Sequence, residues 1–266
     1  MQEPDTCFKW LTAARAAMRC SRYGMAFLIA GLMLASTVHA EFKVRSPLVE
    51  EGEFEYEHNG SVTFDKSKSG KNNDQSYTHE LGYGVTSFWM AEVEGEFEAA
   101  PGSNLRFKAT TFENTFQLTP QGKYFADLGF FAEYSHVANR NDPDTVKFGP
   151  LVETELGSTL HTLNLLFEKQ IGLHRTDATD FTPAWQSRWR LHPLFEPGFE
   201  YYGDIGDIAS PGKLAEQQHR AGPVLVGLFD TQGYGKLKYE VGYLFGLTRS
   251  TENGAVRWKL EYEFRF

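Results

Sequence analysis

Alternating glutamates are the side chains of this sequence that could most plainly do chemistry. Glu53, Glu55 and Glu57 stand at every second position, and the same spacing recurs from Glu92 to Glu96. Alternate residues of a β-strand point to one face, so each run would make a row of carboxylates on one wall. Such a row can pair with basic side chains, hold a divalent cation or line a water-filled passage.

Basic residues show the same spacing near the other end of the chain, and two interpretations stay open. Cations of the last strand can neutralise glutamates of the first strand as cross-strand pairs, or separated acidic and basic walls can set a field across a pore. Either way these side chains would face a lumen. The candidate lumen-lining residues are Glu53, Glu55, Glu57, Glu92, Glu94, Glu96, Arg188, Arg190, Arg257, Lys259 and Arg265.

A metal site is the alternative function of the glutamate rows. Like charges at i and i+2 on a strand are typical of a solvated wall, and no Cys/His cluster accompanies them. Both cysteines, Cys7 and Cys20, precede residue 41. We therefore predict no metal and no cofactor.

Period-2 alternation positions these residues and recurs along the chain. It predicts twelve strands of about 8–13 residues, near the roughly 9–11 that a membrane-crossing strand needs and above the ~5–6 usual in soluble proteins. A soluble sandwich is the alternative, but it would need more apolar inward faces. The predicted strands are 53–64, 77–85, 89–97, 105–116 (with a phase change near Thr111–Phe112), 124–137, 146–156, 161–171, 181–191, 195–202, 221–229, 237–247 and 255–266.

The connections between these strands alternate in length. Counted from the N-terminus, the odd ones are long and polar, whereas most even ones are tight turns; 118–123 is the exception. Long loops at one end and short turns at the other are the arrangement of bacterial outer-membrane barrels. The fold class we predict is all-β: a transmembrane, antiparallel, up-and-down β-barrel of about twelve strands over residues 53–266.

The first 40 residues have the composition of a secretory signal peptide. A basic stretch precedes the apolar run Met25–Ala35, and Val38-His39-Ala40 supplies small residues before a cleavage point. A membrane anchor is the alternative interpretation. Residues 41–52 are then expected to be a short periplasmic segment, far too short for the plug domain of a ligand-gated transporter.

Removing that leader sharpens the composition. It holds 4 basic and 2 acidic residues, so the formal net charge moves from −9 to −11. Mean hydropathy is −0.42 and aromatics are 15%, which exclude a helical membrane bundle and argue against disorder. An acidic chain is also a poor partner for nucleic acid.

The C-terminal strand resembles the signature of Gram-negative outer-membrane β-barrels, because the chain ends on Phe with aromatics at alternate positions. In that family this strand is read by the barrel-assembly machinery. The resemblance implies an assembly signal at Trp258, Tyr262, Phe264 and Phe266. It also implies a bacterial outer-membrane location, with outer-membrane lipid and lipopolysaccharide as surroundings.

The segment Glu80–Trp89 resembles the outer-membrane transporters grouped under the meta-pathway of phenol degradation, which are thought to pass small, often aromatic, solutes. Barrel phospholipases need a Ser two residues after a His, a spacing that no histidine after residue 41 shows. Asp177, Asp180 and His174 share a loop, as a barrel protease would require. Acidic residues are common in turns, however, and this explains them without a catalytic role. We predict no enzyme.

Aromatic residues on the apolar faces predict a girdle at the membrane interfaces. Together these features predict a monomeric, passive channel for small solutes; a closed structural or surface-interaction barrel is the alternative. The predicted girdle comprises Trp89, Trp185, Trp189, Trp258, Tyr239 and Tyr243, with Tyr201 on the same kind of face.

Overall fold

The structure, a computed structural model, describes residues 42–65, 72–231 and 235–265. These residues form twelve β-strands and contain no helix long and apolar enough to cross a membrane. The strands are β1 (Phe54–Phe64), β2 (Gln75–Thr86), β3 (Trp89–Ala99), β4 (Arg106–Gln117), β5 (Asp127–Val137), β6 (Asp144–Leu156), β7 (Thr159–Ile171), β8 (Thr179–Trp189), β9 (Glu196–Asp204), β10 (Gln218–Asp230), β11 (Lys236–Gly246) and β12 (Gly254–Phe264).

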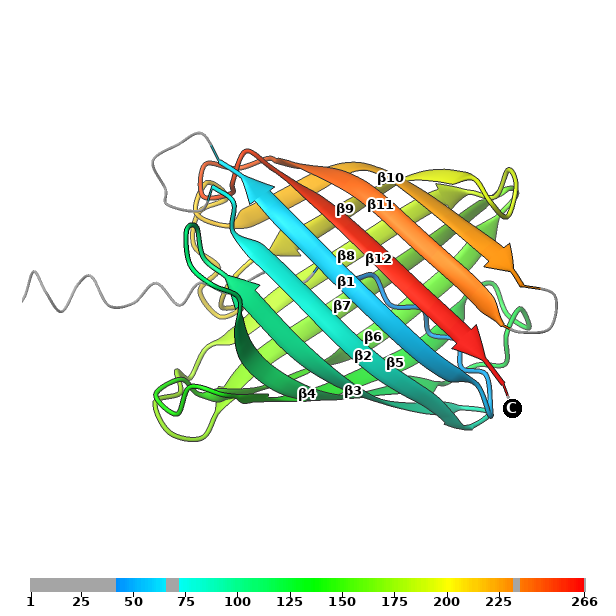
Figure 1. Ribbon diagram of the computed structural model, residues 1–266, viewed down its shortest axis with the longest axis horizontal. Helices are drawn as coiled ribbons and strands as arrows, with labels where there is room; N and C mark the ends of the chain where they lie inside the picture. Colours follow the sequence, from blue (N-terminus) through cyan, green and yellow to red (C-terminus); the bar gives the residue numbers. More distant parts are fainter. Residues whose placement is uncertain (1–41, 66–71, 232–234, 266) are drawn as a thin grey trace, which may run out of the picture. The chain divides into compact units, whose positions relative to one another are not determined.

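The twelve strands close into one antiparallel barrel in sequence order (Figure 1). Closure is made by β1 and β12, which pair from Phe54 opposite Phe264 to Phe64 opposite Gly254. Each strand therefore has two hydrogen-bonded neighbours and no edge is left open. The prediction of an all-β, up-and-down barrel of twelve strands is confirmed, and the predicted strand ends differ from the observed ones by at most three residues.

A β-bulge breaks the alternation of β4, slightly earlier than its sequence indicates. Glu96 of β3 lies opposite Ala109, whereas the next residue, Phe97, lies opposite Phe107. Lys108 is thus the extra residue, three positions before the expected phase change at Thr111. The Nζ of Lys108 lies 3.2 Å from the Glu96 carboxylate.

The two ends of the barrel differ as the connections predict. At one end, on the left in Figure 1, lie the longer loops, including 205–217 between β9 and β10. At the other lie the end of β12 and shorter turns such as 87–88 and 157–158; residues 118–126 are the long exception. We call these the long-loop end and the short-turn end.

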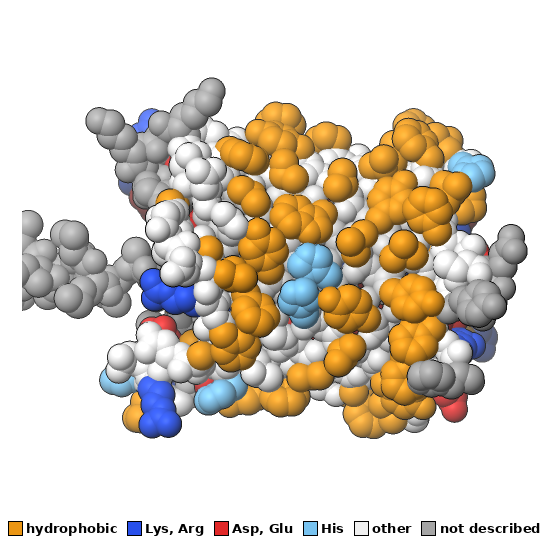
Figure 2. Space-filling view, in the orientation of Figure 1, with side chains coloured by type: hydrophobic (Ala, Val, Ile, Leu, Met, Phe, Trp, Pro, Cys, Tyr) orange, Lys and Arg blue, Asp and Glu red, His pale blue; other side chains and the backbone are white. Residues whose placement is uncertain are grey.

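The outer and inner faces of the barrel carry opposite kinds of side chain. Tyr56, Leu81 and Val93 are exposed on the outside, whereas their sequence neighbours on the inside include the buried Glu57, Glu80 and Glu94. Figure 2 shows apolar side chains spread over the outer face. The rings of His58 of β1 and His79 of β2 lie on paired strands and stack 4.6 Å apart.

Candidate functional site: a lumen crossed by the N-terminal segment

Residues 42–52 are here called the lumen strap; residues 42–49 lie inside the barrel, and residues 50–52 lie at its rim. Lys43, Arg45 and Val49 are buried, and each contacts inward-facing side chains of the wall. The expectation that residues 41–52 form a periplasmic segment is therefore wrong for the described residues 42–49. Residues 1–41, which include the predicted signal peptide, lie outside the described residues.

The strap has few residues, but in extended form it is long enough to run through a barrel. An extended chain advances about 3.3 Å per residue, so eleven residues reach roughly as far as a strand that crosses a membrane. A folded plug domain is not needed, because the surrounding wall supplies the partners of the strap's backbone. Asn164 of β7 shows this directly: its Oδ1 accepts from the Arg45 N–H at 2.7 Å, and its Nδ2 donates to the Arg45 carbonyl at 2.8 Å.

The strap contacts opposite sides of the lumen and is fixed at the short-turn end. The Phe42 ring packs edge-on against Tyr202 of β9 at 5.4 Å. At the other end, the Val49 N–H donates to Gln117 at 2.8 Å, and the Gly52 N–H donates to the Gly84 carbonyl, also at 2.8 Å.

The strap's two basic side chains insert among carboxylates of β1, β2, β4 and β5. Lys43 Nζ lies 3.0 Å from Glu57, 2.5 Å from Glu80 and 3.7 Å from Glu113. Arg45 donates to both oxygens of Glu113, from Nη2 at 2.9 Å and from Nε at 3.3 Å. The strap thus places an ammonium and a guanidinium side by side in the lumen.

These carboxylates form an acidic wall, which we define as Glu57, Glu80, Glu92, Glu94, Glu113 and Glu133. Register makes them direct neighbours across strands: Glu80 lies opposite both Glu57 and Glu94, and Glu113 lies opposite both Glu92 and Glu133. Like charges directly opposite each other destabilise a sheet. The wall therefore needs cations, and Lys43 and Arg45 supply them at its centre.

The charge of Lys43 is secure in this position. Burial alone would lower the pKa of its ammonium, but Glu113, Glu57 and Glu80 outweigh burial and hold that pKa well above its usual range. Because the folded pKa is raised, the stabilisation is fully present below the unfolded pKa and is lost only as the pH rises through the folded value. Lys43 therefore carries its positive charge at neutral pH.

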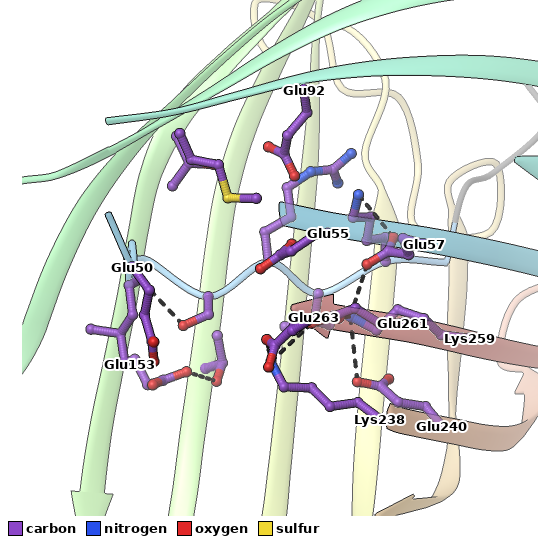
Figure 3. A pocket seen from close by; sticks show the side chains of 18 of the residues that line it. Glu50, Glu55, Glu57, Glu92, Glu153, Lys238, Glu240, Lys259, Glu261 and Glu263 are labelled. Carbon is purple, nitrogen blue, oxygen red and sulfur yellow. Dashed lines mark hydrogen bonds and ion pairs between the residues drawn. The ribbon is translucent and has the colours of Figure 1, made fainter. Parts of the chain in front are cut away.

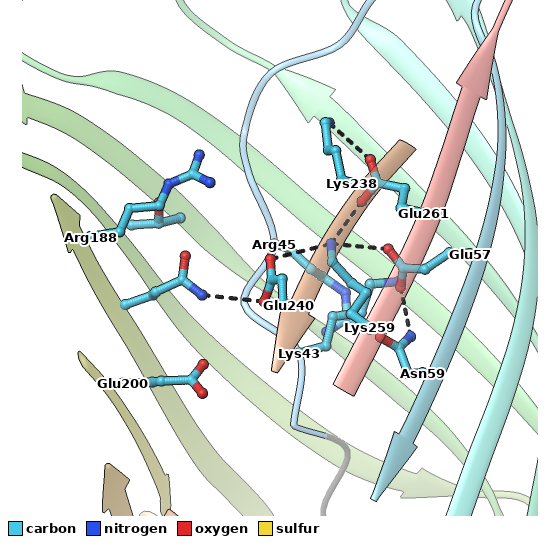
Figure 4. A network of polar contacts seen from close by, with 12 residues as sticks. Lys43, Arg45, Glu57, Asn59, Arg188, Glu200, Lys238, Glu240, Lys259 and Glu261 are labelled. Atoms are coloured by element: carbon cyan, nitrogen blue, oxygen red, sulfur yellow. Dashed lines mark hydrogen bonds and ion pairs between the residues drawn. The ribbon is translucent and has the colours of Figure 1, made fainter. Parts of the chain in front are cut away.

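Cations of the wall pair with glutamates of nearby strands, as Figure 4 shows for Lys238 and Lys259. Arg257 is almost fully buried and binds Glu200 through two hydrogen bonds, with Glu240 2.7 Å from its Nη1. Lys259 reaches across the β1–β12 seam to Glu57 at 3.1 Å and also binds Glu261 at 2.8 Å. Cross-strand pairing thus accounts for Lys259, whereas Arg257 turns away from β1.

Beside the strap, towards the short-turn end, a cavity of about 260 Å³ persists (Figure 3). Glutamates dominate its walls, among them Glu55 and Glu92, and Lys238 stands opposite with its Nζ 2.8 Å from Glu261. The cavity is therefore lined mainly by polar side chains. The strap occupies the lumen on the side of the cavity that faces the long-loop end.

The candidate lumen residues divide between the lumen and its rim. Glu94 belongs to the acidic wall, and Glu96 accepts from Thr111 at 2.7 Å further towards the long-loop end. Arg188 lines the cavity and lies 3.4 Å from Glu196.

Three further candidates lie at the short-turn rim, outside the strands: Glu53, Arg190 and Arg265. Arg190 is half-exposed and binds Glu155 at 3.0 Å. Arg265 is also half-exposed, with Glu53 3.6 Å away. Arg190 and Arg265 follow the last residues of β8 and β12. The alternating pattern continues beyond these strand ends, so it predicted wall positions for two residues that lie outside the wall.

The aromatic girdle is only partly at the strand ends. Trp89, Trp189 and Tyr239 lie towards the short-turn end, and Tyr243 lies towards the long-loop end. Trp185 and Trp258 lie near the middle of their strands, away from the strand ends where a girdle is expected. Trp258 fits at mid-strand because its partner is Gly60, where an added Cβ would lie 2.3 Å from the indole.

Sequence reasoning missed Lys43, Arg45, Glu80, Glu113 and Glu133. The glutamates were overlooked because none belongs to an alternating run of acids on its own strand, and the site assembles them only through register. Lys43 and Arg45 did carry a signal, since they alternate with Phe42 and Val44 as strand residues would. A basic pair with strand spacing, next to a barrel with surplus carboxylates, indicates a segment that enters the lumen.

A glycine of β2 allows the strap to dock, which gives a first prediction. A Cβ on Gly84 would lie 2.0 Å from the Glu50 carbonyl oxygen, whereas one on Gly95 would meet nothing closer than 3.6 Å. We expect Gly84→Ala to lower the free energy of unfolding by about 1–3 kcal/mol and Gly95→Ala to change it by less than about 0.5 kcal/mol. Urea unfolding of the refolded protein measures both, and equal effects would contradict the docking.

Comparison with known proteins supports the fold and goes no further. No protein-family model and no curated protein matches the chain. Among solved structures, the NanC porin in its rhombohedral crystal form is 9% identical, with a TM-score of 0.51 over 79% of this chain and 100% of the porin. The translocator domain of autotransporter NalP from Neisseria meningitidis is 10% identical, with a TM-score of 0.51 over 96% of this chain and 97% of that domain. This chain is thus similar in fold to β-barrels of the outer-membrane kind.

Proposed function

We propose that the protein is a channel of the bacterial outer membrane for small solutes, and that the lumen strap closes it at rest. The observation that carries the proposal is a lumen lined by polar and acidic side chains and obstructed by a segment that forms no part of the barrel wall. A strap held by ion pairs and a few hydrogen bonds can leave without opening any strand. The likeness in fold to a porin is consistent with this proposal.

The outer surface supports the membrane location. Large apolar side chains are exposed on successive strands, with Leu81 at 61% and Phe112 at 49%. A contiguous apolar surface of this kind is unfavourable in water and is suited to lipid. By this proposal the long loops face outward, the short turns face the periplasm, and lipid with lipopolysaccharide surrounds the barrel.

Two variants of the same experiment test conduction. The full chain and a variant lacking residues 42–49 are refolded into planar bilayers, and heat-modifiable migration confirms that each barrel has folded. We expect rare, brief openings from the full chain and sustained discrete openings from the variant. A folded but silent variant would contradict the channel and favour the second candidate, a closed structural barrel, which the extensive ion pairing of the lumen also suits.

Export and assembly belong to the proposal as well. A leader cleaved after Ala40 would leave a chain that starts one residue before the strap, and the aromatics Trp258, Tyr262, Phe264 and Phe266 would then guide assembly. N-terminal sequencing of the protein from the outer-membrane fraction tests the cleavage, with Glu41 as the expected first residue. A soluble periplasmic protein would contradict the location.

A further inference from the structure

We infer that the acidic wall is a binding site for small organic cations, namely primary amines and guanidines, and that Lys43 and Arg45 occupy it as a built-in ligand. The inference rests on the proposed function, since it names the class of solute that would replace the strap. It comes from the contacts that the strap's two cationic groups make.

The ammonium position is set by carboxylates from three strands. Glu57 of β1, Glu80 of β2 and Glu113 of β4 all lie within 4 Å of Lys43 Nζ. An ammonium carries three N–H donors and no acceptor, so three surrounding carboxylates match its chemistry. All three glutamates are buried, which strengthens their attraction for a cation relative to water.

The guanidinium position has a different and equally specific geometry. Glu113 accepts the paired N–H groups of Arg45 in a fork, the arrangement that distinguishes guanidinium from ammonium. The guanidinium carbon lies 4.4 Å from the centroid of the Phe131 ring, and Glu133 lies 3.8 Å from Nη2. A carboxylate on one side and an aromatic face on the other favour a flat, delocalised cation.

The wall's own cations pair with the flanks of the acidic wall. Among the described residues, Lys259 reaches Glu57 and Lys147 reaches Glu133, the two flanks of the acidic wall. The basic side chains within ion-pair distance of Glu80 and Glu113 are those of the strap. The cavity repeats this imbalance: apart from the strap, nine glutamates and three basic residues line it. A vacated lumen would therefore attract cations.

The spacing of the two positions suggests the probe. Lys43 and Arg45 present an amine and a guanidine that share Glu113, so a short molecule with both groups can satisfy both positions. Agmatine has this composition, and 1,5-diaminopentane carries two amines. Glutarate and 1,5-pentanediol have similar length with negative or no charge, which makes them matched controls.

Calorimetric titration into refolded protein tests the inference without requiring a current. We expect agmatine to bind the Lys43→Ala/Arg45→Ala variant about tenfold more tightly than the unaltered chain, because the built-in ligand is gone. Adding Glu80→Gln and Glu113→Gln should abolish that binding, whereas Glu155→Gln, at the exposed rim, should leave it unchanged. Equal binding of glutarate or the diol, or binding insensitive to the two glutamates, would overturn the inference.

Bilayer recordings separate this inference from the proposed function. Across a tenfold KCl gradient, the double variant should show a reversal potential of cation preference, and agmatine should reduce its current. Current without cation preference would overturn the cation site while the channel stands. Agmatine binding by a folded, silent barrel would overturn the channel while the binding site stands.

Discussion

Replacing Lys43 and Arg45 together with alanine is expected to raise the time-averaged current through the refolded barrel about tenfold or more. The reason is that these two side chains supply the strap's ionic contacts with the acidic wall. With them gone, the strap loses its ion pairs with the acidic wall and keeps the Phe42–Tyr202 ring contact and hydrogen bonds such as the Asn164 pair, each worth ~1 kcal/mol. The recording is made in planar bilayers at fixed salt and voltage.

Two control variants make that result interpretable. Lys43→Arg/Arg45→Lys retains both charges and should stay nearly closed. Lys213→Ala/Arg249→Ala removes two exposed loop charges and should leave the current at the level of the unaltered chain. An equal rise in all three variants would show that the current does not depend on the strap.

The second large effect is expected at Arg257, the largest side chain fully buried in the structure. Arg257→Met should lower the free energy of unfolding by about 3–5 kcal/mol, because it leaves Glu200 and Glu240 buried without their guanidinium. Urea unfolding measures the loss. Gly242 of β11 leaves room for the Glu200 carboxylate, because a Cβ added at Gly242 would lie 2.6 Å from Glu200 Oε1.

Charge removal at the partner tests the cause of that loss. Adding Glu200→Gln to Arg257→Met should recover part of the stability, since it removes one of the two negative charges left without the guanidinium. Arg190→Met, at the half-exposed rim pair with Glu155, should cost less than about 1 kcal/mol. If Arg257→Met and Arg190→Met cost the same, the buried network would not stabilise the barrel.

Alternation accounts for most of the fold, because a barrel strand exposes one face to each environment along its whole length. It placed Glu57 and Trp258 on opposite faces without any knowledge of register. It could not place Trp258 along the membrane normal, since the space beside Gly60 arises only when β1 and β12 pair. Depth within a barrel depends on neighbours that are distant in sequence.

The candidate site was harder to predict for the same physical reason. Runs such as Glu92–Glu96 are visible within one strand, whereas Glu80 and Glu113 become neighbours of other acids only through strand pairing. In residues 42–52 the strand spacing of Lys43 and Arg45 indicates a segment that enters the lumen, but the wall residues that it meets are set by strand register. The excess of acidic over basic residues after residue 40 is the sequence property that anticipates cations from outside the barrel wall.

A disulfide that fixes the strap to the wall tests the central claim most directly. An added Cβ on Gly129 would lie 2.7 Å from the Cβ of Pro47, so a small shift would bring Pro47→Cys and Gly129→Cys into disulfide range. The pair is placed in the Lys43→Ala/Arg45→Ala chain with Cys7 and Cys20 replaced by serine, and one bilayer is recorded before and after reductant. We predict a closed barrel when oxidised and sustained openings after reduction. The same current in both states would contradict closure by the strap.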